Sequence, residues 1–253
     1  LIHNMNRTNA AWTCSSCNAQ HLTTVHYCNQ CYFIEIPSAQ WKDDLSSIHK
    51  YSLEQQQFHL TSTLGSATRS IIIEGRSYEP PKHVQSHSHP YKSFYSTTLL
   101  LIKPILEALG LPTIPNNIIW NYYWGKYTVG FHIDKAPWVI VLSITLSGTA
   151  TAIFQPRGWA PSQSPSSHPT THLSIDSMHI FLAGPRGHRH QITNHGHHGG
   201  QRINLTIRYT QSDLGHLQPE EAMQRIFDTL NNPMSISPSP AMPTPPSPPP
   251  TLT

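Results

Sequence analysis

Seven short runs of residues constrain the fold of this chain more than any other feature of its sequence. They lie between residues 116 and 210, are separated by Gly, Pro and polar turns, and read NNIIWNYYW, TVGFHID, WVIVLSITLSG, TAIFQP, SMHIFLAG, HQIT and RINLTIRYT. Runs of this length, rich in β-branched and aromatic residues, predict strands. Many short strands after a helical segment are typical of two packed antiparallel sheets. We therefore expect a mainly β protein with flanking helices and a double-stranded β-helix (jelly roll) core.

Helices are predicted on both sides of these strands. Residues 95–111, YSTTLLLIKPILEALGL, form an apolar helical segment that ends at Gly110. Residues 219–230 begin with Pro-Glu-Glu, which favours the start of a helix. A further short helix is expected at residues 41–57. Between two of the strands, the Pro- and Ser-rich insert 157–172 predicts a long surface loop.

The chain divides into four regions. Residues 11–33 hold all the cysteines, residues 34–90 form a polar linker region, residues 91–230 form the folded core, and residues 231–253 form a tail. The tail is rich in Pro, Ser and Thr and cannot bury an apolar core. We expect it to be disordered, with polyproline character, and to act as a spacer or as a ligand for a protein partner.

The cysteines follow the spacing C-x2-C-x10-C-x2-C in the segment WTCSSCNAQHLTTVHYCNQC. Each C-x2-C pair directs two thiolates at one ion, and two such pairs form the closed tetrahedral site that structural Zn²⁺ prefers. The spacing therefore predicts a small four-cysteine zinc finger that folds only with its metal. Its ligands would be Cys14, Cys17, Cys28 and Cys31. We expect this finger to be a unit separate from the core. Four free or disulfide-linked cysteines are the alternative.

This segment resembles the small Ran-binding-protein-type zinc fingers. These fingers carry a Trp two residues before the first Cys, here Trp12, and the same ten-residue central gap. Members bind single-stranded RNA or ubiquitin. The RNA binders usually have an Asn four residues after the second Cys, where this chain has His21. The ubiquitin binders usually have Thr-Phe directly after it, where this chain has Asn18-Ala19. The resemblance implies an accessory module that binds RNA or a protein, and a purely structural finger is the alternative.

Composition disfavours several classes of protein. Because every cysteine lies in one cluster, we expect a reducing, intracellular compartment, without distinguishing nucleus, cytoplasm or organelle. No apolar run is long enough for a membrane span, and the first twelve residues lack the apolar core of a signal peptide. The net charge of +3 is too small to indicate a nucleic-acid binder by itself.

A His-x-Asp pair, His132 and Asp134, lies in one of the predicted strands. Side chains at positions i and i+2 of a strand point to the same face, so both can approach one ion. Two His and one carboxylate suit non-haem Fe(II) and leave positions open for substrate and O₂. The third ligand would come from a later strand, where His188 and His190 are candidates. Alone, the pair also fits an ordinary half-exposed strand.

The last strand run places polar residues at alternate positions, namely Arg202, Asn204, Thr206 and Arg208. All four face one side of a strand, and two arginines directed into a barrel are costly unless they bind anions. A dicarboxylate such as 2-oxoglutarate offers one carboxylate to each guanidinium. The alternative is a solvent-exposed polar face with the intervening aliphatic residues in the core.

Together these residues make the region 91–210 resemble the AlkB family of Fe(II)- and 2-oxoglutarate-dependent dioxygenases. The family motif is Asn-x-Tyr, His-x-Asp, a distal His with an aliphatic residue at fixed spacing, and Arg-x-Asn-x-Thr-x-Arg. The corresponding residues are Asn121 and Tyr123, His132 and Asp134, His190 and Ile192, and the run from Arg202 to Arg208. His188 lacks the aliphatic residue at the family's spacing, so His190 is the preferred third ligand.

The resemblance implies a role for each of these positions. The Fe(II) ligands would be His132, Asp134 and His190. The residues contacting 2-oxoglutarate would be Asn121, Tyr123, Arg202, Asn204 and Arg208. Within that set, Arg208 would bind the distal carboxylate of 2-oxoglutarate and Arg202 the carboxylate at its keto end. Residues 34–90 include the place of the family's substrate lid.

The implied activity is oxidative demethylation of alkylated bases in DNA or RNA, with 2-oxoglutarate converted to succinate and formaldehyde released. The position two residues after Asp134, often acidic in base-repairing members, is Ala136 here. Two alternatives stay open: an AlkB-like oxygenase that acts on a protein, and a scaffold or assembly subunit that keeps the fold without turnover.

Overall fold

The structure is a computed structural model, and it describes part of the chain. The described residues are 11–13, 20–22, 26–28, 32–36, 41–60, 69–75, 96–134, 137–155, 170–184, 187–195 and 201–231. The predictions for Cys14, Cys17 and Cys31 and for the tail from residue 232 onward lie outside the described residues.

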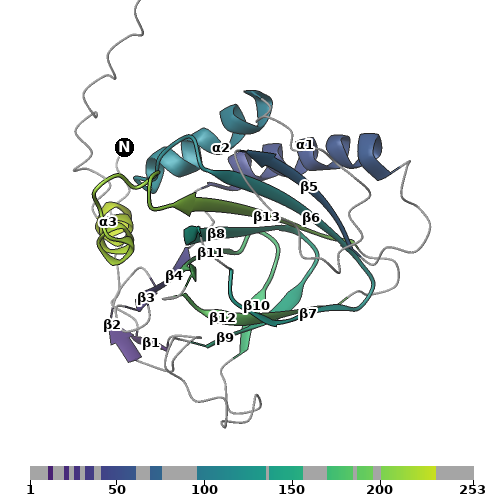
Figure 1. Cartoon of the computed structure of the whole chain (residues 1–253). Helices are drawn as coiled ribbons and strands as arrows, with labels where there is room; N and C mark the ends of the chain where they lie inside the picture. The colour runs from purple at the N-terminus through teal and green to yellow at the C-terminus, as the bar shows by residue number, and fades with distance from the viewer. Residues whose placement is uncertain are drawn as a thin grey trace, which may run out of the picture.

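A seven-stranded sheet forms the frame of the molecule (Figure 1). In spatial order its strands are β3 (His26–Cys28), β4 (Phe33–Ile36), β11 (Met178–Leu182), β8 (Trp138–Ser147), β13 (Gln201–Thr210), β6 (Asn117–Trp124) and β5 (Arg69–Gly75). Every neighbouring pair is antiparallel. The strand β13 pairs with β8 on one side and β6 on the other, so its residues reach both halves of the sheet.

A four-stranded antiparallel sheet faces the large sheet (Figure 1). Its strands, in spatial order, are β10 (Thr170–Leu173), β9 (Ala150–Gln155), β12 (Arg189–Asn194) and β7 (Tyr127–His132). A separate pair joins β1 (Ala11–Thr13) to β2 (Gln20–Leu22). The predicted mainly β, jelly-roll architecture is therefore confirmed, and each of the seven runs that predicted strands contains one.

Helices cover the large sheet on the side away from the small one (Figure 1). They are α1 (Lys42–Leu60), α2 (Ser96–Ala108) and α3 (Pro219–Asn231). All three match the predicted helices. Gly110 follows α2 with a φ of 66°, the left-handed conformation that commonly ends a helix. None of the described helices combines the length and apolar character that crossing a membrane requires.

Alternation along β13 separates the apolar core from the polar interior. Ile203, Leu205, Ile207 and Tyr209 pack in the main hydrophobic cluster with residues of the helices. The even-numbered residues of β13 include Arg202, which is 2% exposed, and Arg208, whose side chain is 11% exposed. The predicted polar face is thus buried between the two sheets, and the alternative of a solvent-exposed face does not hold.

Two strands occur where linker or loop was predicted. The strand β5 lies in the region expected to be a linker, and β10 lies at the end of the predicted 157–172 loop. Tertiary contacts stabilise β5. The buried Glu74 accepts hydrogen bonds from Trp120 Nε1 at 2.8 Å and Thr98 Oγ1 at 3.0 Å, and so ties β5 to β6 and α2.

The second half of the predicted finger belongs to the large sheet. The strand β3 pairs with β4, and β4 pairs with β11. Cys28 is fully buried in a second hydrophobic cluster that also contains Phe33, Trp138 and Phe154. This packing differs from the expected boundary at residue 33, because a three-residue strand can bury its apolar side chains only against a larger sheet.

We predict that Cys28→Ser destabilises the β core and not the finger alone. A hydroxyl is more polar than a thiol, and burying it in this apolar cluster should cost about 1–3 kcal/mol of unfolding free energy. Urea unfolding followed by tryptophan fluorescence should show one transition at a lower midpoint, and Cys28→Ala, which leaves no buried hydroxyl, should lose less. An unchanged core transition in Cys28→Ser would contradict the packing described.

Candidate active site

Two imidazoles meet where β7 pairs with β12. His190 is the cross-strand partner of His132, and their ring centroids lie 4.2 Å apart. The next pair in the register joins Ile192 to Val129, so β7 has one extra residue in this interval. Such a β-bulge re-aims side chains, and both Val129 and His132 line the same pocket.

Backbone carbonyls fix the orientation of both rings. His132 Nδ1 lies 2.8 Å from the Gly130 carbonyl, and His190 Nδ1 lies 3.3 Å from the His188 carbonyl. Because a carbonyl only accepts, the Nδ1 atoms carry the protons and the Nε2 atoms keep their lone pairs. Metal-binding histidines are commonly oriented in this way. Burial lowers the pKa of His190 to about 4, so this ring is neutral at neutral pH.

Asp134 follows β7, and its carboxylate lies near His190 and Arg208. One of its carboxylate oxygens is in a hydrogen-bonded ion pair with Arg208, and the other lies 3.8 Å from His190 Nε2. Burial favours the neutral acid, but the charge of Arg208 and its hydrogen bond oppose this effect, and the net result is a pKa of Asp134 below its ordinary value. The carboxylate is therefore ionised.

The donor atoms suit Fe(II), although they are not arranged around a common centre. Within the described ranges, no three His, Cys, Asp or Glu side chains stand in metal-coordinating geometry. The Asp134 carboxylate instead forms an ion pair with Arg208. Two imidazole Nε2 atoms and one carboxylate are nevertheless the donor set that non-haem Fe(II) takes.

His188 is placed away from this site. Its ring lies among the rings of Phe33, Phe154 and Phe181, at centroid distances of 5.7 to 6.3 Å. Neither ring nitrogen has a hydrogen-bond partner among the described residues. Of the two candidates for the third ligand, the structure therefore brings His190, and not His188, to His132.

The side-chain amides of Asn121 on β6 and Asn204 on β13 line the region next to the two histidines. These two residues are cross-strand partners. Asn204 Nδ2 donates to Ser143 Oγ at 3.0 Å and to the Ile144 carbonyl at 2.8 Å, while Asn121 Nδ2 donates to Thr206 Oγ1 at 3.2 Å. These bonds hold both amides in fixed orientations on the pocket surface.

The two arginines of β13 lie at opposite ends of this region. Arg208 is beside Asp134, the end that would hold the metal. Arg202 donates to Asn194 Oδ1 and Thr145 Oγ1, each at 3.2 Å, and its Cζ lies 5.4 Å from the centroid of the Tyr123 ring. Arg208 is thus the arginine next to the expected iron ligands, and the assignment of the two arginines to the two carboxylates of 2-oxoglutarate stays a prediction.

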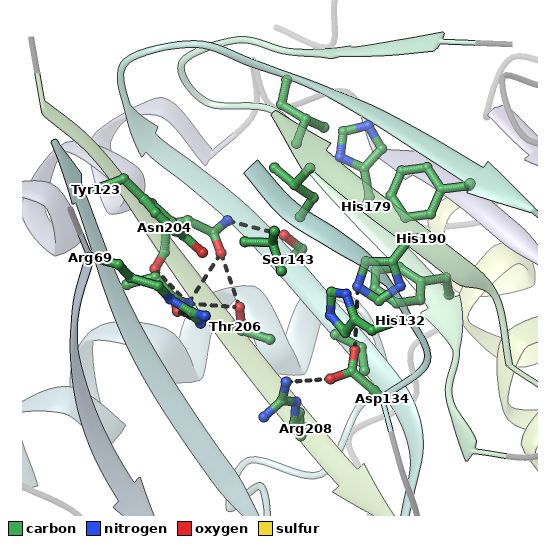
Figure 2. A pocket seen from close by; sticks show the side chains of 17 residues that line it. Arg69, Tyr123, His132, Asp134, Ser143, His179, His190, Asn204, Thr206 and Arg208 are labelled. Carbon is green, nitrogen blue, oxygen red and sulfur yellow. Dashed lines mark hydrogen bonds and ion pairs between the residues drawn. The ribbon is translucent and has the colours of Figure 1, made fainter. Parts of the chain in front are cut away.

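One pocket joins these parts, with Asp134 and His190 at one end and Arg69 and Tyr123 at the other (Figure 2). It is lined by Arg69, Asn121, Tyr123, Val129, His132, Asp134, Val141, Ser143, Phe154, Leu173, His179, Phe181, His190, Ile192, Asn204, Thr206 and Arg208. All the predicted iron and cosubstrate residues line it except Arg202. Sequence reasoning missed Arg69, Ser143 and Phe154, which belong to no motif.

Comparison with known proteins adds a likeness in fold. No protein-family model matches the chain, and no curated protein matches it in sequence. The structure of OsALKBH1 is 15% identical over 70% of this chain and 97% of that chain, with a TM-score of 0.49. A prolyl hydroxylase in complex with a hypoxia inducible factor peptide, from Trichoplax adhaerens, is 10% identical over 75% of this chain and 89% of that chain, with a TM-score of 0.45. At these identities and scores, neither likeness assigns the chain to a family.

We predict that Asp134→Asn lowers the free energy of unfolding at neutral pH by about 3–5 kcal/mol, because Arg208 loses its charged partner in a buried pair. The folded-state pKa of Asp134 lies below its ordinary 3.8, so the stabilisation is complete above that value and is lost as the pH falls through the folded-state pKa. In urea titrations at a series of pH values, the difference between wild type and variant should shrink toward the most acidic samples.

The exposed Asp228 on α3 provides the matched control for this titration. Asp228→Asn should change the unfolding free energy by less than about 0.5 kcal/mol at every pH. If Asp134→Asn gave the same flat profile, the ion pair with Arg208 would not contribute to stability.

Proposed function

We propose that this protein is an Fe(II)- and 2-oxoglutarate-dependent dioxygenase that oxidatively demethylates alkylated bases of DNA or RNA. The observation that carries the proposal is the pairing of His132 with His190 across β7 and β12, with both Nδ1 atoms turned to carbonyls and Asp134 alongside. These residues supply two imidazoles and one carboxylate, the donor set that suits non-haem Fe(II). The resemblance of residues 91–210 to the AlkB-family motif also supports this proposal.

The order of the residues along the pocket supports one orientation of the cosubstrate. A 2-oxo acid binds a metal through its 1-carboxylate and keto oxygen, so this end belongs beside His132, Asp134 and His190. Arg208, next to Asp134, then neutralises the 1-carboxylate. The chain of 2-oxoglutarate would run past Asn121 and Asn204 toward Tyr123, which places its distal carboxylate at the other end of the pocket.

When bound, Fe(II) supplies the activation of O₂ that couples decarboxylation of 2-oxoglutarate to oxidation of an N-methyl carbon. The chain's own residues position the reactants and exclude water. Phe154 and Phe181 lie 5.8 and 5.2 Å from the His190 ring, measured between centroids. This apolar wall keeps solvent away from one side of the metal site, which protects a reactive oxidant from side reactions.

The proposal also includes the N-terminal cysteine segment, as a binding module, and the tail, as a spacer or a ligand for a protein partner. We propose that Cys14, Cys17, Cys28 and Cys31 bind Zn(II) and that this segment contacts the nucleic acid or a protein partner. The base would have to leave its stack to reach the pocket, as in other enzymes that modify bases.

We predict that purified protein with Fe(II) and ascorbate converts 2-oxoglutarate to succinate without added substrate. His190→Ala should lower the succinate yield by at least about 100-fold, because a metal ligand is lost. His188→Leu should retain the yield, since that ring faces the phenylalanine cluster. Succinate measured by mass spectrometry checks both. No succinate from the wild type would favour the scaffold alternative.

We predict that methylated oligonucleotides are the substrates. Single-stranded DNA and RNA carrying N-methylated bases should each be tested against a methyl-lysine peptide, with the loss of 14 Da per methyl group as the readout. Formaldehyde should form in equal amount. Demethylation of the peptide alone would redirect the proposal to a protein target.

A further inference from the structure

Three side chains from adjacent strands form a row at the end of the pocket away from Asp134. Arg69 on β5 is the cross-strand partner of Tyr123 on β6, and Tyr123 is the partner of Arg202 on β13. Each guanidinium carbon lies 5.4 Å from the centroid of the Tyr123 ring. The ring therefore stands between two cations, and each interaction resembles a cation–π contact.

The two arginines differ in what they can reach. Arg202 is 2% exposed, is engaged by Asn194 and Thr145, and does not line the pocket. Arg69 lines the pocket and uses one amino group to donate to Asn121 Oδ1 at 2.7 Å. Its Nε–H is buried and has no hydrogen-bond partner among the described residues. A guanidinium has five donors, so Arg69 keeps donors for a ligand.

Among the described residues that line the pocket, no carboxylate lies at this end. Asp134 is the only acidic residue among the described residues that line the pocket, and it is bonded to Arg208 at the opposite end. Burial lowers the pKa of Arg202 to about 10, and the charge of Arg69 adds to this effect. An anion placed beside Arg69 would relieve the repulsion between the two guanidinium groups.

We infer that Arg69 binds the distal carboxylate of the dicarboxylate cosubstrate. Arg202 is then a positioning residue whose guanidinium packs against the Tyr123 ring. This inference rests on the proposed function. The forked donors of Arg69 match a carboxylate and face the pocket beside Tyr123 (Figure 2). The hydrogen bond from Arg69 to Asn121 Oδ1 holds this guanidinium in place before the ligand arrives.

This assignment is tested by the preference of the protein for a 2-oxo acid with a second carboxylate over one without it. Anaerobic calorimetry with Fe(II)-loaded protein should compare 2-oxoglutarate with 2-oxopentanoate, which has the same carbon chain and a methyl group in place of the distal carboxylate. Wild type should bind 2-oxoglutarate at least about tenfold more tightly, as expected for a charge-assisted hydrogen bond. Arg69→Gln should remove most of this preference while the affinity for 2-oxopentanoate stays unchanged.

Control variants separate this role from a structural one. Arg225→Gln, at an exposed site on α3, should behave as wild type. Arg69→Lys keeps the charge without the fork and should keep part of the preference; it also serves if Arg69→Gln fails to fold. Equal weakening of both ligands in Arg69→Gln, or an unchanged preference, would overturn the inference and leave the proposed function standing. A wild type that binds neither ligand would refute the proposed function, and the inference with it.

Discussion

The buried pairing of Asp134 with Arg208 is the interaction on which the rest of the site depends. Arg208 sits on β13, the strand between β8 and β6, while Asp134 follows β7 of the small sheet. The pair therefore joins the two sheets at one end of the pocket. Neither charge is stable in this interior without the other. The same contact keeps the carboxylate ionised and beside His190, so fold and chemistry use one interaction.

Local sequence patterns were sufficient for most of the fold. Alternation along β13 predicted one buried face and one polar face, and the aromatic and aliphatic run of β6 predicted its neighbour. The His-x-Asp and Arg-x-Asn-x-Thr-x-Arg spacings indicated which side chains share a face, because the period of a strand is fixed. The structure brings the two motifs side by side through the ion pair of Asp134 with Arg208, and it pairs His132 with His190.

Features that depend on non-local contacts could not be read in this way. The run RSIIIEG lies alone in a polar region, and its pairing with β6 and the burial of Glu74 decide its structure. Arg69 consequently had no motif to mark it. The positions of Arg202 and Arg208 along the pocket could not be predicted either, because a strand pattern gives the face of a side chain but not which end of a pocket it reaches.

The hairpin formed by β3 and β4 has a consequence for the solution behaviour of the protein. It covers β11, a strand whose residues are all buried and mostly aliphatic or aromatic. Without that cover, β11 would present unsatisfied backbone groups along an apolar margin, a template for strand addition between molecules. The three-residue β3 is too short to offer a comparable template. The strands β3 and β4 thus protect this edge of β11 from pairing with a strand of another molecule.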